Sequence, residues 1–142
     1  PVKKTFKIEE PTLGTLDRLS AEWIEFAIDE AALQSDDGMQ KTRTLVHSHS
    51  IRCAKVVALA VLGSDYLIPT QGKGGVVRYV EDTNQLEYLT SLFARQIKPS
   101  KLYQLYILIS AMCNLGDFLN SIRLMSAERT TMPIRIEENN VG

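Results

Sequence analysis

Two histidines, His47 and His49, are the only ones in the 142-residue sequence, so any histidine-based catalysis or metal site must use them. On a helix, residues two positions apart point about 200° apart around the axis, so these imidazoles diverge. A helical zinc site needs histidines four residues apart, and neither Cys53 nor Cys113 lies in a C-x-x-C pair that would complete one. The sequence therefore predicts no metal site, and both histidines are interpreted as helix-surface or boundary residues.

The other sequence patterns that could support catalysis or phosphate binding do not match the known motifs either. The run Gly72–Gly75 suggests a phosphate-binding loop, but that motif needs glycine where Leu67 stands and serine or threonine where Gly74 stands. Carboxylates between residues 22 and 30 can share a helix face, as acidic surface helices often do, and no G-x-S-x-G nucleophile motif is present. We expect no catalytic residue, no cofactor and no enzyme activity.

Tyr103 and Tyr106 lie three residues apart, so they share one face of a predicted helix. Such a pair can stack a nucleic-acid base. Few lysines and arginines surround it, so packing in the protein core is the favoured interpretation.

Length and composition indicate one globular domain, residues 1–142, with 44% hydrophobic and 23% charged residues. The lysines near the N-terminus precede Glu9, Glu10 and Pro11 rather than an apolar signal core. No apolar run long enough to span a membrane is apparent. We expect a cytoplasmic protein whose two cysteines stay reduced.

Charge is segregated along the chain although the net charge is only −1. Residues 9–37 hold nine acidic side chains and one basic one, whereas residues 38–80 hold six basic and one acidic. Two antiparallel helices with complementary solvent faces explain this pattern, and an acidic face offered to a basic partner is the alternative. The low net charge argues against a broad nucleic-acid-binding surface.

Hydrophobic spacing and capping residues predict a mainly α fold, a compact bundle of about five helices. The first follows Thr12 and is either one bent helix or two. A largely apolar helix over 39–62 is expected at the centre of the core, ended by Gly63 in the left-handed conformation. The remaining helices are predicted from Asp82 to Pro99, from Ser100 to Asn114, and from Asp117 to Met125.

Short β-strands are expected near the N- and C-termini. Phe6 and Ile8 alternate with polar residues within 3–8, as Ile134 and Ile136 do near the other end. These two segments could pair with each other. The rest of 128–142 is predicted to be a polar C-terminal tail.

The segment 63–81 is predicted to be a long glycine-rich loop or a loose hairpin. Loops of this length in compact domains are often functional. Its apolar side chains are therefore the candidate protein-binding residues, although a connection without a partner is an equal alternative. The candidates are Tyr66, Ile68, Val77 and Tyr79.

The chain resembles the tail assembly chaperones of long-tailed bacteriophages. The opening pattern Lys4, Phe6, Ile8, Pro11, Thr12, Leu13, Gly14, followed by a helix with Leu19 and Trp23, is similar to theirs, and the run Gly116–Ile122 looks like their last helix. The resemblance implies a non-catalytic protein of the bacterial host cytoplasm that binds the tape-measure protein and other tail proteins, and keeps the former soluble during tail-tube assembly. Self-association is left open.

The alternative is a small helical adaptor or regulator that binds protein or nucleic acid through a basic helix face. Salt distinguishes the two, because phosphate binding weakens steeply between low and physiological salt whereas apolar binding does not. The basic residues are Lys41, Arg43, Arg52 and Lys55.

Overall fold

A computed structural model describes residues 3–26, 30–34 and 36–127 of the chain. The chain divides into two compact units, Pro1–Met112 and Cys113–Gly142, which are described separately.

The first unit is mainly helical, as predicted, but its helices are fewer. Four of them have twelve or more residues: α1 (Leu13–Ile24), α3 (Gly38–Leu62), α4 (Thr83–Gln96) and α5 (Pro99–Cys113, whose last residue begins the second unit). The only other α-helix among the elements of this unit's described residues is α2 (Glu30–Leu33), a single turn. This unit therefore has four long helices where a bundle of about five was predicted.

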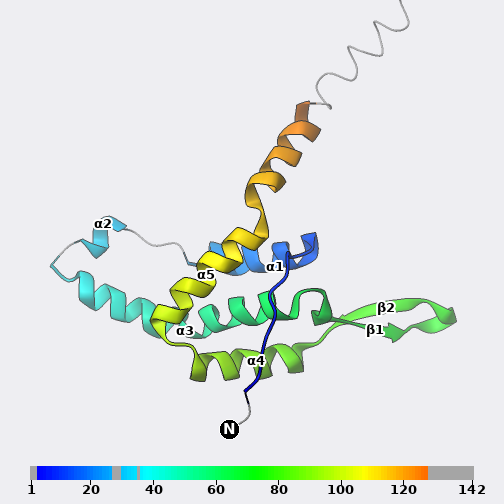
Figure 1. Ribbon diagram of the computed structural model, residues 1–142, viewed down its shortest axis with the longest axis horizontal. Helices are drawn as coiled ribbons and strands as arrows, with labels where there is room; N and C mark the ends of the chain where they lie inside the picture. Colours follow the sequence, from blue (N-terminus) through cyan, green and yellow to red (C-terminus); the bar gives the residue numbers. More distant parts are fainter. Residues whose placement is uncertain (1–2, 27–29, 35, 128–142) are drawn as a thin grey trace, which may run out of the picture. The chain divides into compact units, whose positions relative to one another are not determined.

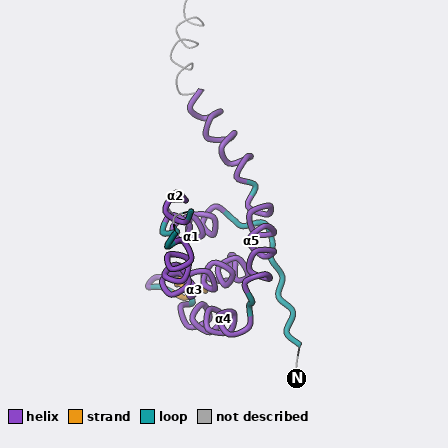
Figure 2. The backbone as a smooth tube through the Cα atoms, turned by 90° about the vertical axis from the view of Figure 1, so that its left-hand side faces the viewer, coloured by secondary structure: helices purple, strands orange, loops and turns teal. Residues whose placement is uncertain are grey.

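Helix α3 lies between α1 and α4, with α5 on one side (Figures 1 and 2). Its N-terminal half is largely exposed, whereas Ala54 and most residues from Val56 to Leu62 are buried. Ala58 and Ala60 are small, which lets neighbouring helices come close to the α3 backbone. The prediction that this helix forms the centre of the core is confirmed.

Helix α1 is continuous through Ser20, so the alternative of two separate helices within 13–24 is wrong. The Thr12 hydroxyl accepts a hydrogen bond from the backbone N–H of Thr15, as expected of an N-cap. Thr15, Leu16 and Leu19 are buried, and α1 contacts α3.

Helix α4 has the predicted cap, since the Asp82 carboxylate accepts from the backbone N–H of Gln85 at 3.1 Å. Its buried stripe is Leu86, Leu89 and Phe93. Helix α5 begins at Pro99 rather than after Ser100, a position that suits proline because the first helical N–H has no partner within the helix.

The N-terminal residues 3–12 form neither strand nor helix, so the strand predicted over 3–8 is wrong. Alternate side chains nevertheless point to one partner, α4. The Phe6 ring packs edge-on against Phe93 at 5.1 Å, and the Lys4 ammonium donates to the Tyr88 hydroxyl at 2.8 Å, which lowers the pKa of that phenol. The predicted C-terminal strand with Ile134 and Ile136, and the tail 128–142, lie outside the described residues.

Of the two forms considered for 63–81, the structure has the hairpin. Strands β1 (Leu67–Gln71) and β2 (Val77–Glu81) are antiparallel and extend away from the helices (Figure 1). A short 3-10 turn, Gly63–Tyr66, links the hairpin to α3. Gly63 has positive φ as predicted, but with φ 52° and ψ −130° it is not in the left-handed helical region.

The second unit contains a helix over residues 115–127. Asn114, with φ 49°, separates it from α5, in line with the predicted break. The Phe118 N–H donates to the Asn114 carbonyl, so the helix begins earlier than the expected Asp117.

Candidate protein-binding surfaces

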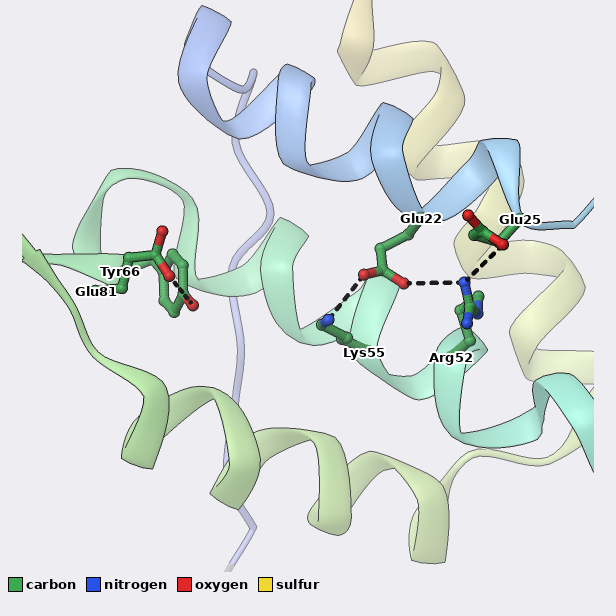
Figure 3. Close-up of polar contacts among 6 residues, drawn as sticks. All are labelled: Glu22, Glu25, Arg52, Lys55, Tyr66 and Glu81. Atoms are coloured by element: carbon green, nitrogen blue, oxygen red, sulfur yellow. Dashed lines mark hydrogen bonds and ion pairs between the residues drawn. The ribbon is translucent and has the colours of Figure 1, made fainter.

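The hairpin does not gather the four residues predicted to bind a partner. Tyr66 is only 5% exposed, and its hydroxyl donates to the Glu81 carboxylate at 3.0 Å (Figure 3). Burial, followed by the hydrogen bond to Glu81, raises the pKa of this phenol. Tyr66 is thus part of the core, and its predicted place on an exposed binding surface is wrong.

The other three candidates are exposed but lie on both faces of the hairpin. Directly opposed residues point to the same face, and Ile68 is opposite Val80 whereas Tyr79 is opposite Pro69. Since neighbouring residues alternate, Val77 and Tyr79 share one face and Ile68 lies on the other. A partner bound to one face would therefore contact only part of the predicted set.

The opposite charges of the two chain segments meet between α1 and α3. Glu22 pairs with Lys55 at 2.8 Å and with Arg52 at 3.7 Å, and Glu25 lies 3.9 Å from Arg52 (Figure 3). The interpretation of complementary helix faces is thus supported over an acidic face kept for a partner.

The same contacts weaken the nucleic-acid alternative. Of the four basic residues proposed for it, Arg52 and Lys55 face carboxylates of α1, and Lys41 lies 3.7 Å from Asp37. Phosphate binding needs cations that are available to displace counterions. The proposed basic face offers fewer of them than the sequence suggested.

We expect Glu22→Gln to lower the free energy of unfolding by about 1–2 kcal/mol, because it leaves two half-buried cations without their closest counter-charge. The Glu22 side chain is only 16% exposed. Glu25→Gln is the matched control: that side chain is 62% exposed, so its loss should cost less than about 0.5 kcal/mol. Urea unfolding at low and high salt measures both, and equal effects would contradict the assigned geometry.

No chemical centre emerges from the part of the chain that the structure describes. Those residues contain no group of three or more histidine, cysteine, aspartate or glutamate side chains able to hold a metal ion. His49 packs against the Phe26 ring at 5.2 Å instead. Both cysteines are free, and burial raises the pKa of the Cys53 thiol, which disfavours the reactive thiolate.

An apolar pocket of about 420 Å³ lies between α1, α3 and α5. Trp23 and Tyr106 meet edge-to-face at its wall, and Tyr103 stands at it with 70% of its surface exposed. Tyr106 is 51% exposed, so the expectation that both tyrosines pack in the core is wrong. Sequence periodicity placed both tyrosines on one helix face, but it did not show that this face is exposed to solvent.

Within the second unit, the helix over 115–127 carries large apolar residues that are exposed. Leu124 lies on the opposite side of this helix, whereas its other five large apolar residues recur at intervals of three and four, which places them in one stripe. Each is between 42% and 53% exposed. This C-terminal stripe consists of Leu115, Phe118, Leu119, Ile122 and Met125.

Two helical stretches, Gly38–Tyr66 and Pro99–Ala127, are long and apolar enough to cross a membrane, judged by length and composition only. By this measure, the expectation that no apolar stretch is long enough to span a membrane is wrong. The helix at the centre of a protein core also meets this criterion, and the apolar half of Gly38–Tyr66 is buried in the core of the first unit.

Comparisons of the chain with known protein families, with curated proteins and with solved structures find no match.

Proposed function

We propose that this chain is a bacteriophage tail assembly chaperone that acts without catalysis in the bacterial cytoplasm. Its partner would be the tape-measure protein, which it keeps soluble while the tail tube assembles. The observation that carries the proposal is the C-terminal stripe, an amphipathic helix whose apolar side is about half exposed along its whole length.

An amphipathic helix of this kind binds by packing its apolar side against another apolar helix or groove. Contiguous exposed apolar surface is uncommon on proteins without a partner and marks interaction sites. A long helical protein awaiting assembly exposes the complementary surface. The resemblance to tail assembly chaperones also falls on this helix, at Gly116–Ile122.

Polar residues within the stretch favour a protein partner over a lipid bilayer. Lys101, Asp117 and Arg123 lie within Pro99–Ala127, as do Asn114 and Asn120. Charged side chains are costly at the centre of a membrane. A partner bound to the C-terminal stripe leaves Asp117, Asn120 and Arg123 of the same helix in water.

The test is capture of purified helical segments of candidate tape-measure proteins by the full chain, at low and at high salt. Exchanging stripe residues for glutamine keeps helix propensity but removes the apolar surface. We expect the combined variant Phe118→Gln, Leu119→Gln, Ile122→Gln to weaken binding at least about 100-fold, as loss of central interface residues does. The matched control, Asn120→Gln with Arg123→Gln, alters the other side of the helix and should bind like the wild type.

Three results would overturn the proposal. They are a stripe variant that binds as tightly as the control, capture of nucleic acid only and only at low salt, and flotation with lipid vesicles without capture of any protein segment. The second result would favour the adaptor and the third a membrane-bound role.

A further inference from the structure

The hairpin has one open edge and one blocked edge. In an antiparallel pair, residues alternate between positions whose backbone groups bond across the pair and positions whose groups point outward. The Gly72 N–H donates to the Val76 carbonyl, and the Asp82 N–H to the Tyr66 carbonyl, at the two ends of the ladder. In the shared register these contacts assign the inward positions to the even-numbered residues.

The outward positions of β1 are therefore Leu67, Pro69 and Gln71. Proline has no N–H, so the centre of this edge cannot donate a hydrogen bond to a further strand. Proline at an edge is a common protection against unwanted strand pairing.

The outward positions of β2 are Val77, Tyr79 and Glu81, each with a backbone N–H and a carbonyl. The whole strand is exposed, with Val77 54%, Tyr79 66% and Val80 50% exposed. A two-stranded pairing alone is marginally stable in water, and three or more strands are usually needed. β2 thus has free backbone groups and exposed apolar side chains along its outer edge. Pairing with a further strand would stabilise the hairpin.

We propose that β2 pairs with β2 of a second copy of this chain, antiparallel and across a two-fold axis at Tyr79, to make a four-stranded sheet. In this register all five residues of β2 are paired, Tyr79 opposite Tyr79 and Val77 opposite Glu81 of the other copy. Arg78 is opposite Val80, so no two like charges are directly opposed, a contact that would destabilise the sheet.

A second copy fits this edge better than an unrelated strand because the assembly closes. Pairing through β2 uses the open edge of both copies and leaves two β1 edges outside, each with Pro69 at its centre. Further strands are then blocked, so the product is a dimer and not a fibre. On one face of the four-stranded sheet, the residues at the two-fold axis are then Pro69, Tyr79, Tyr79 and Pro69 in order across the strands. The two exposed tyrosine rings would shield each other from water.

The first experiment is sedimentation equilibrium of the full chain and of Tyr79→Pro. Because the Tyr79 N–H points outward, proline there removes a bond between copies but none within the hairpin. We expect the dimer dissociation constant to rise at least about tenfold, because two symmetry-related backbone hydrogen bonds between the copies are lost and the packing around them is disturbed. Tyr79→Val, which keeps the N–H and favours strands, is the control and should still dimerise.

A disulfide cross-link tests the proposed register of β2 against β2 of the second copy. It does not depend on whether the hairpin tolerates proline at position 79. Residues opposite each other at a bonded position have Cα atoms about 5.5 Å apart, within the range of a disulfide. With Cys53 and Cys113 changed to alanine, Tyr79→Cys should form a covalent dimer on mild oxidation, whereas Thr70→Cys on β1 should not.

A monomer at all concentrations, a dimer unaffected by Tyr79→Pro, or equal cross-linking from Thr70→Cys would each overturn this proposal. None of these variants touches the C-terminal stripe, so capture of tape-measure segments can be measured on them separately.

Discussion

Phe93→Ala is expected to lower the free energy of unfolding by about 3–5 kcal/mol, the usual range for emptying a buried phenylalanine site. Phe93 is 7% exposed at the buried side of α4, which packs on α3. Its ring also carries the edge-on contact to Phe6, so the variant should loosen residues 3–12 as well. Urea unfolding followed by circular dichroism measures the loss.

Phe6→Ala is the matched control, because Phe6 is 38% exposed and its removal leaves α3 and α4 in contact. We expect it to cost about 1–2 kcal/mol. The double variant then gives the coupling between the rings, expected at about 0.5–1.5 kcal/mol. Equal losses from the two single variants would contradict the assignment of Phe93 to the core.

Gly63→Ala is expected to destabilise the first unit by about 1–3 kcal/mol through backbone strain alone. The φ and ψ values of Gly63, 52° and −130°, are accessible to glycine and strained for residues with a side chain. A Cβ there would meet no atom within 4 Å, so no clash adds to the cost. Thermal unfolding by calorimetry measures the change.

Gly14→Ala separates backbone strain from the general effect of adding a methyl group. Gly14 lies within α1, and a Cβ there would meet its nearest neighbour, the Arg18 guanidinium, at an ordinary 3.9 Å. Alanine in a helix should stabilise by up to about 1 kcal/mol. The two substitutions are therefore expected to shift the melting temperature in opposite directions, and a melting temperature that Gly63→Ala leaves unchanged or raises would show that Gly63 does not need its positive φ.

The helices were predictable because their signals are local. Asp82 and Gln85 mark the start of α4 in the sequence as they do in the structure, and the apolar run before Gly63 marks the end of α3. Their buried stripes were predictable too, since a period of three to four residues states which side chains share a face. The count for the first unit is one lower than predicted because the last predicted helix, from Asp117 to Met125, belongs to the second unit.

The candidate binding residues were less predictable because exposure depends on neighbours remote in sequence. Tyr66 and Tyr103 look alike in an apolar pattern, yet the first is buried beside Glu81 and the second is 70% exposed. The C-terminal stripe was foreseen as a helix with apolar spacing, but the local sequence does not state how far its side chains are exposed.

The sequence by itself determined the helical class, the position of α3 at the centre of the core and the breaks at Gly63 and Asn114, because capping, φ preference and periodicity act within a few residues. Only the tertiary structure decided that residues 3–8 lie on α4 instead of joining a sheet, and that Ile68 faces away from Tyr79. It also decided that Glu22 and Glu25 pair with Arg52 and Lys55 of α3. Each of these depends on which distant segment covers a given face, and alternation or charge along the chain does not specify that partner.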